Sequence, residues 1–164
     1  MDLNEFNRLS VDDARAALRP CLDVDRWIDG VIAARPFSAV ESALEAARAS
    51  ANPLTDDEIN QAMTHHPRIG EKAKGSGAEA AHSSREQAGL GALDDSIQDR
   101  LAAGNAAYEE RFDRVFLIRA AGRSPEEILA ELERRMANSD TAELAEVGEQ
   151  LIQIAALRLE GILA

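Results

Sequence analysis

The chain of 164 residues has the length of one ordinary domain, and with 45% hydrophobic residues it can bury a core without disulfides. Its 30 Asp and Glu against 18 Lys and Arg give a formal net charge of −12, which argues against nucleic acid and anionic membranes as partners. Cys21 is the one cysteine, no apolar run approaches the roughly 20 residues of a membrane span, and the N-terminus does not resemble a signal peptide. We therefore expect a soluble, acidic, cytoplasmic single domain over residues 1–164.

The composition favours helices over sheets, because only 4% of the residues are aromatic while Ala, Leu, Glu and Arg dominate. Five segments carry a capping residue with an acidic residue three positions on, which is typical of a helix N-terminus. They begin at Ser10, Ser38, Thr55, Ser124 and Asp140. We predict an all-α, single compact helical domain of about seven to nine helices, near residues 11–19, 24–34, 39–50, 56–63, 84–111, 125–137 and 141–163.

Two segments interrupt this pattern. Residues 67–82 form a predicted loop that contains glycines and both lysines of the chain. Residues 112–120 (FDRVFLIRA) carry a short β-branched and aromatic run, but a single strand has no partner, so we predict irregular extended backbone. Gly89, Gly91 and Gly104 weaken the long helix predicted over 84–111, which could consist of two pieces.

All three histidines, His65, His66 and His82, lie within eighteen residues. They could be surface or capping residues, and a metal site of His82 with Glu86 is a weaker alternative because no second His or Cys stands at ligand spacing. Pro67 excludes His66 from the helical region of backbone space. This places an imidazole at the end of a helix, facing a glycine-containing loop.

The segment of residues 83–87 (SSREQ) allows two interpretations. Ser83 and Glu86 have the spacing of a capping box, a common structural device worth about 1 kcal/mol. Glu86 could equally be a catalytic carboxylate, and the spacing alone does not separate the two roles.

Arg158 lies on the apolar stripe of the last predicted helix. At about 100° per residue it is roughly 140° from the polar Gln153, on the side that also carries Val147, Leu151, Ile154 and Ile162. A guanidinium facing the core must meet an anion or several carbonyls, since an unpaired buried charge is costly. Either an internal salt bridge or a clamp for an anionic substrate satisfies this requirement.

Four blocks of the sequence, in order, resemble the OHCU decarboxylase family. Residues 65–71 (HHPRIGE) are similar to its His-Pro-Arg-Ile-Gly block, and Ser83-x-x-Glu86-Gln87, seventeen residues beyond His66, is similar to its Ser-x-x-Glu-Gln block. Residues 112–124 (FDRVFLIRAAGRS) and 154–159 (IAALRL) resemble its third and C-terminal blocks. Asp113 and Arg114 depart from the family, whose members often have Gly followed by an aromatic or similar residue.

This resemblance implies decarboxylation of 2-oxo-4-hydroxy-4-carboxy-5-ureidoimidazoline (OHCU) to (S)-allantoin and CO2, the third step from urate to allantoin. It implies a carboxy-lyase with a helical fold, no metal or organic cofactor, a small-molecule ureidoimidazoline substrate and commonly a homodimer. By residue, it implies that His66 and Glu86 are catalytic. It also implies that the substrate is bound by Pro67, Ser83, Ser84, Arg85, Glu86, Gln87, Ile118, Arg119, Ala120, Ala121, Gly122 and Arg158.

The chemistry agrees with these residue types. Loss of CO2 leaves an electron pair that the ring C=N of the substrate can accept, so the protein supplies orientation, charge stabilisation and one stereospecific proton. We expect His66 to deliver the proton to the carbanionic carbon or to assist formation of the carbanion, and Glu86 to accept from hydroxyl or ureido N–H groups. Gln87 and the main chain near Ile118 would bind amide edges, and Arg158 would pair with the carboxylate or other polar oxygens.

Two other functions compete with this one. The same site could serve a hydrolase or isomerase of a related ureide. The chain could also be a non-enzymatic acidic helical interaction module, which accounts for the composition but not for an inward-facing Arg158.

Overall fold

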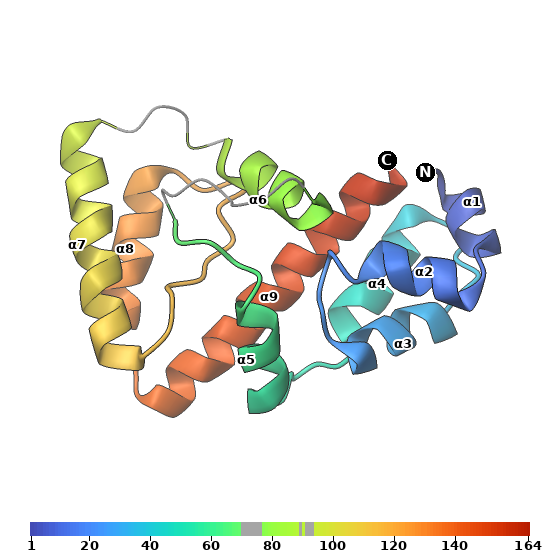
Figure 1. Cartoon of the computed structure of the whole chain (residues 1–164), viewed down its shortest axis with the longest axis horizontal. Helices are drawn as coiled ribbons and strands as arrows, with labels where there is room; N and C mark the ends of the chain where they lie inside the picture. The colour runs from blue at the N-terminus through green and yellow to red at the C-terminus, as the bar shows by residue number, and fades with distance from the viewer. Residues whose placement is uncertain (70–76, 89, 91–93) are drawn as a thin grey trace. The chain divides into compact units, whose positions relative to one another are not determined.

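The computed structural model describes residues 1–69, 77–88, 90 and 94–164, and this part of the chain contains nine helices and no strand (Figure 1). The all-α prediction is confirmed. The helices are α1 (Leu3–Arg8), α2 (Val11–Leu18), α3 (Asp25–Ala33), α4 (Val40–Ala49), α5 (Asp56–Met63), α6 (Ala78–Ala88), α7 (Asp95–Phe112), α8 (Pro125–Arg135) and α9 (Asp140–Leu163).

Three of the five predicted capping residues begin helices as expected. The side chains of Ser10, Thr55 and Ser124 accept the backbone N–H three residues on, at 3.1, 3.2 and 3.1 Å. The other two predictions are wrong by one residue: α4 follows Ala39, and the N-terminal capping hydroxyl of α9 is that of Ser139, which accepts from Ala142 N at 3.1 Å. Where several polar residues stand near the start of a helix, their spacing in the sequence does not determine which side chain accepts the first backbone N–H groups.

The helix predicted over 84–111 is two helices, as its glycines suggested, because α6 ends at Ala88 and α7 begins at Asp95. α6 also begins at Ala78, inside the predicted loop of residues 67–82, whose residues 70–76 lie outside the described part. The short helix α1 was not predicted, although Asp2 and Glu5 form a reciprocal capping box there.

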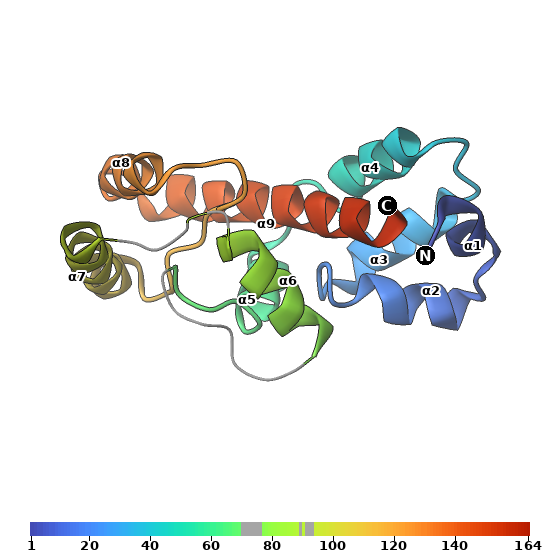
Figure 2. The same cartoon turned by 90° about the horizontal axis from the view of Figure 1, so that it is seen from above.

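Contacts divide the chain into two compact units, of which the first comprises residues 1–62 and 151–164. In it, α3 packs against both α2 and α4, as Figure 2 also shows. Trp27 of α3 is fully buried, and its indole N–H donates to the Ala47 carbonyl of α4 at 2.8 Å. The second half of α9 contributes the buried residues Leu151, Ala155 and Leu159. The prediction of one domain over residues 1–164 stays a prediction.

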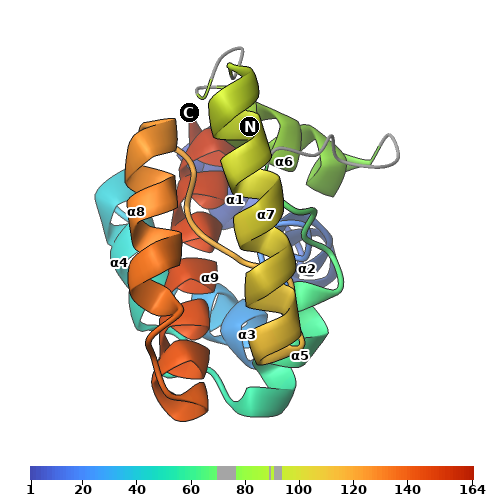
Figure 3. The same ribbon diagram turned by 90° about the vertical axis from the view of Figure 1, so that its left-hand side faces the viewer.

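The second unit comprises residues 63–150. Here α7 and α8 pack side by side (Figure 3) at Gly104, where a Cβ atom would lie only 2.8 Å from a Leu132 methyl group. After α7 the chain runs without regular structure through the core of this unit, where Phe116 is fully buried and Ile118 is 3% exposed. The predicted irregular backbone of residues 112–120 is thereby confirmed from residue 113 onward.

Asp113 ends α7 in a left-handed conformation, with φ 56° and ψ 39°. Its N–H bonds to the Glu109 carbonyl at 2.9 Å, as in a common helix C-terminal motif. Glycine is the residue best suited to this conformation because it has no Cβ atom. The departure from the family pattern noted at Asp113 thus leaves the turn in place but adds conformational strain to it.

We predict that Asp113→Gly raises the free energy of unfolding by about 1 kcal/mol, since it removes both the left-handed strain and a negative charge at a helix C-terminus. Urea unfolding followed by circular dichroism measures the change. Asp113→Ala is the control, because it removes the charge but keeps the Cβ atom. Equal stability of the Gly and Ala variants would contradict the strain argument.

Candidate active site

His66 lies three residues beyond α5, and its N–H donates to the carbonyl of Met63, the last residue of that helix, at 3.4 Å. Pro67 restricts His66 to extended backbone, so the chain leaves the helical path here. Both residues are half-buried, whereas the preceding His65 is exposed. The two adjacent histidines therefore differ in their exposure to solvent.

The segment that follows His66 and Pro67 is fixed to α7. Arg68 forms an ion pair with Glu109, with Nη2 at 3.0 Å from Oε2. One residue on, the Ile69 carbonyl accepts a hydrogen bond from the buried Asn105 side chain at 3.2 Å. These two contacts hold the His66–Pro67 turn in the second unit.

The residues of the Ser-x-x-Glu-Gln block lie inside α6. Ser83 is 3% exposed, and Glu86 and Gln87 are half-buried. On a helix, residues separated by three and four positions share a face, so Ser83, Glu86 and Gln87 lie on one side. Ser84 and Arg85 are exposed on another side, and their predicted contact with the substrate has no support in the burial pattern.

This placement excludes the capping-box interpretation of Ser83 and Glu86. α6 begins at Ala78, so Ser83 lies in the second turn, where the backbone N–H groups bond within the helix. A capping box requires its first residue to precede the helix. Of the two interpretations of Glu86, the structure therefore leaves that of a catalytic carboxylate.

Residues 118–122 form the third predicted element of the site. The Arg119 N–H donates to Gln150 Oε1 at 2.8 Å, and the Arg119 carbonyl accepts from Arg123 Nε at 3.0 Å. Gly122 has a φ of 79°, which favours glycine. Ile118 and Ala120 are buried, whereas Arg119 and Ala121 are half-buried.

Arg158 belongs to the first unit, in the second half of α9. It is 4% exposed, as predicted from the apolar stripe, and its Nη1 donates to the Pro20 carbonyl at 3.0 Å. The Pro20 carbonyl accepts a hydrogen bond from Arg158, but a neutral carbonyl does not balance the positive charge of the guanidinium.

The structure thus brings most of the predicted site residues into one unit. His66, Pro67, the residues of α6 and the main chain of 118–122 belong to the second unit, and Arg158 belongs to the first. The sequence profile of the OHCU decarboxylase family matches residues 7–160. The chain belongs to the OHCU decarboxylase family.

Proteins of similar sequence support this family membership. A 2-oxo-4-hydroxy-4-carboxy-5-ureidoimidazoline decarboxylase of Haloferax volcanii is 26% identical over 97% of this chain and 94% of its own length. A uric acid degradation bifunctional protein of a Bacillus species is 23% identical over 99% of this chain, which spans 32% of that longer protein. A decarboxylase of the same name from Amia calva is 37% identical over 60% of this chain and 57% of its own.

Two solved structures share the fold. A crystal structure of OHCU decarboxylase in the presence of (S)-allantoin has a TM-score of 0.68 at 23% identity, covering 88% of this chain and 95% of that one. A crystal structure of (S)-allantoin synthase has a TM-score of 0.70 at 15% identity, covering 98% of this chain and 54% of that one. At these identities the likeness concerns the fold of this OHCU decarboxylase family member.

His82 and Glu86, the pair considered as metal ligands, lie one turn apart on α6, and His82 is buried. Within the described ranges, no group of three or more His, Cys, Asp or Glu side chains is placed to hold a metal ion. Over the same ranges, no helix has the length and apolar character needed to cross a membrane.

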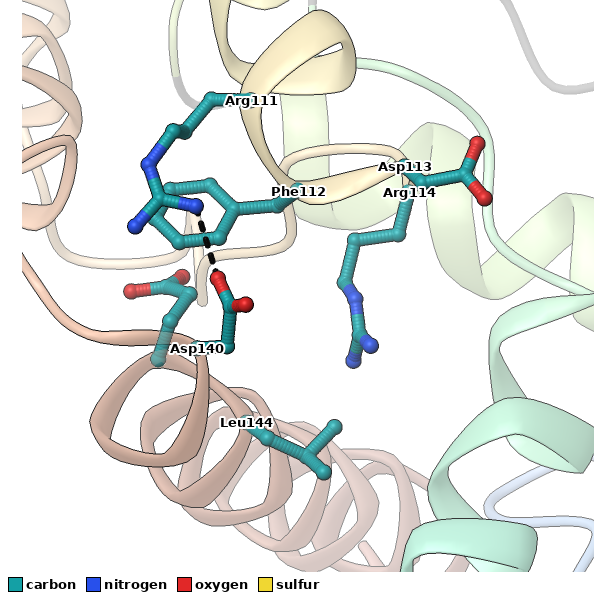
Figure 4. A pocket seen from close by; sticks show the side chains of 7 residues that line it. Arg111, Phe112, Asp113, Arg114, Asp140 and Leu144 are labelled. Atoms are coloured by element: carbon teal, nitrogen blue, oxygen red, sulfur yellow. Dashed lines mark hydrogen bonds and ion pairs between the residues drawn. The ribbon is translucent and has the colours of Figure 1, made fainter.

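A pocket of about 260 Å³ lies in the second unit of this family member, where α7 ends and α9 begins (Figure 4). Arg111 forms an ion pair with Asp140 on its wall, at 2.7 Å, and the carboxylate of Asp113 points away from the Arg114 guanidinium. None of the residues predicted to bind the substrate lines this pocket. It is therefore not the candidate active site.

A buried polar network in the second unit was missed by the sequence reasoning. Arg135 and Glu143 form an ion pair, each with a side chain only 1% exposed, and the Tyr108 hydroxyl donates to Glu143 Oε1 at 2.6 Å. Burial raises the pKa of Tyr108 well above its usual range, and the bond to Glu143 raises it further, so the phenol stays a donor. Arg135 follows the apolar Ile128 by seven residues and Leu132 by three, so the helical period that placed Arg158 inside could have indicated its burial as well.

Proposed function

We propose that this chain catalyses the cofactor-independent decarboxylation of OHCU to (S)-allantoin and CO2, as a carboxy-lyase. Its membership in the OHCU decarboxylase family supports the proposal, as does the full-length relative from Haloferax volcanii. The observation that carries it is structural: Ser83, Glu86 and Gln87 share one face of α6, in the interior of the helix, where none of them is needed as a cap.

The reaction places few demands on the protein. The bond between the ring carbon and the carboxylate breaks and CO2 leaves. Its electron pair forms a C=C bond to the ureido-bearing carbon, and the electrons of the ring C=N move to the nitrogen, which takes up a proton, so that an enol results. The enol hydroxyl then loses a proton, and the ureido-bearing carbon gains one on a single face to become the stereocentre of (S)-allantoin. The substrate supplies the electron sink, so the protein needs only to orient it and transfer protons.

We assign the proton transfers to two side chains. His66 delivers the proton to the ureido-bearing carbon, because an imidazole exchanges protons near neutral pH. Glu86 accepts the proton of the hydroxyl and hydrogen-bonds the ureido N–H groups. Gln87 and the main chain at 118–122 bind the amide edges of the substrate, and Arg158 pairs with its carboxylate.

We also propose an oligomeric state and a cellular location for this enzyme. The resemblance implies a homodimer, and the acidic composition with a single cysteine favours a cytoplasmic enzyme. Sedimentation or light scattering of the purified protein measures the oligomeric state directly.

The deciding experiment uses OHCU prepared immediately before use. Incubation with the protein is expected to release CO2 and form (S)-allantoin, recorded by gas evolution and circular dichroism. A hydrolase or isomerase would consume OHCU without CO2. An interaction module would leave only the spontaneous reaction, in which a proton reaches either face of a planar carbon and the allantoin is racemic.

We predict that Glu86→Gln lowers turnover by about 10²-fold or more and leaves the melting temperature almost unchanged, because an amide cannot accept the hydroxyl proton. Steady-state kinetics and thermal unfolding measure the two effects. Glu45→Gln, at an exposed position of α4, is the matched control and should keep both properties. Full activity in Glu86→Gln would remove Glu86 from the proton transfer.

A further inference from the structure

Both peptide groups that flank Ile118 are held by side chains from other helices. The Leu117 carbonyl, in the peptide before Ile118, accepts a hydrogen bond from Arg135 Nη1 of α8 at 2.7 Å. The Arg119 N–H, in the peptide after Ile118, donates to Gln150 Oε1 of α9 at 2.8 Å. The backbone on either side of Ile118 is therefore tied to a helix.

Arg135 is a rigid anchor for the first of these bonds. Its guanidinium is fully buried, it forms an ion pair with Glu143, and it lies over the Phe116 ring, 4.6 Å from the ring centroid. Glu143 is fixed in turn by Tyr108 and by Asn138, whose amide donates to Oε2 at 3.0 Å. A buried charge pair with all these partners has little freedom to change its geometry.

The geometry of a trans peptide transmits these constraints to Ile118. Both peptides are trans and planar, so the N–H and C=O of each point in opposite directions. With the Leu117 carbonyl directed at Arg135, the Ile118 N–H points away from Arg135. With the Arg119 N–H directed at Gln150, the Ile118 carbonyl points away from Gln150.

The two groups oriented in this way have no partner within the described part of the chain, where no hydrogen bond involves the Ile118 main chain. Ile118 is only 3% exposed. A buried, unpaired amide donor and carbonyl acceptor are costly unless a ligand or water completes them. An N–H donor beside a carbonyl acceptor can also bind the edge of an amide, because that edge presents a carbonyl and an N–H group in return.

We propose that Arg135 and Gln150 are positioning residues that aim the Ile118 N–H and carbonyl at an amide edge of the ureidoimidazoline substrate. This inference rests on the proposed function and adds to it the residues that set the recognition of that edge. Neither Arg135 nor Gln150 touches the substrate; each acts through the main chain.

Gln150 offers the cleaner test, because it is half-buried and outside the Arg135–Glu143 pair. Gln150→Met removes the acceptor of the Arg119 N–H at similar side-chain length. We expect KM for OHCU and the Kd of (S)-allantoin to rise about tenfold, with kcat within about twofold, since the contact is the same in the ground and transition states. Gln150→Glu keeps an acceptor oxygen and should restore KM to within about threefold.

Glu149→Met, at the adjacent exposed position of α9, is the matched control and should leave KM unchanged. A second measurement follows amide hydrogen exchange: (S)-allantoin should slow exchange of the Ile118 N–H in the wild type, and Gln150→Met should speed exchange of the Arg119 N–H.

The inference is overturned if an active wild type shows no protection of Ile118 by (S)-allantoin, or if Gln150→Met keeps the wild-type KM. It is also overturned if Gln150→Glu is as impaired as Gln150→Met. Failure of the proposed function looks different, because the wild type itself would then neither speed CO2 release from OHCU above the spontaneous rate nor give an excess of (S)-allantoin.

Discussion

His66→Asn is expected to lower kcat for OHCU decarboxylation by about 10²–10⁴-fold while the fold persists, because asparagine keeps a polar shape but has no transferable proton. The allantoin that still forms should lose its enantiomeric excess, since the remaining protonation is not directed to one face. Steady-state kinetics with circular dichroism of the product measures both effects. His66 is half-buried after α5, so its replacement leaves the main core intact.

His65→Asn is the control for this prediction. The two histidines are neighbours, yet His65 is exposed and is not followed by proline. We expect its kcat to stay within about threefold of the wild type. Enantiospecific turnover at the wild-type rate in His66→Asn would show that another group donates the proton.

Arg135→Met should lower the free energy of unfolding by about 3–5 kcal/mol, the usual result of stranding one partner of a buried ion pair. Glu143 would stay buried with only Tyr108 and Asn138 as donors, and the Leu117 carbonyl would lose its partner. Urea unfolding, with the slope checked against the wild type, measures the loss.

Arg134→Met provides the comparison from the adjacent residue. Arg134 pairs with Glu131 and Glu146, but its side chain is 50% exposed, so its loss should cost less than about 1 kcal/mol. Adding Glu143→Gln to Arg135→Met removes the stranded charge and should recover about half of the lost stability. If Arg135→Met lowers the free energy of unfolding no more than Arg134→Met does, the buried ion pair does not have this stabilising role.

Helix positions were largely predictable, because the signals that begin a helix act within one turn. Ser10, Thr55 and Ser124 each bond the N–H three residues on, as their spacing indicated. The same rule misled at Ser83, which has the spacing of a cap but lies inside α6. Where a helix starts depends on the residues before it as well, and the spacing of two side chains does not contain that information.

The candidate site was predictable in part for a similar reason. Pro67 determines that the chain leaves the helical path at His66, and the apolar period of α9 places Arg158 inside. Both are consequences of backbone sterics or helix geometry. Neither required knowledge of what packs against these residues.

Only the tertiary structure decided how the buried charges pair and how the main chain at Ile118 is oriented. Tyr108 and Glu143 are 35 residues apart, and Arg135 reaches the Leu117 carbonyl across 18. The helical period places Arg135 on the apolar side of α8, but it does not indicate which carboxylate or carbonyl its guanidinium meets. The sequence by itself determined the local conformations, since these follow from neighbours within a turn, whereas pairing and orientation depend on which helices pack together.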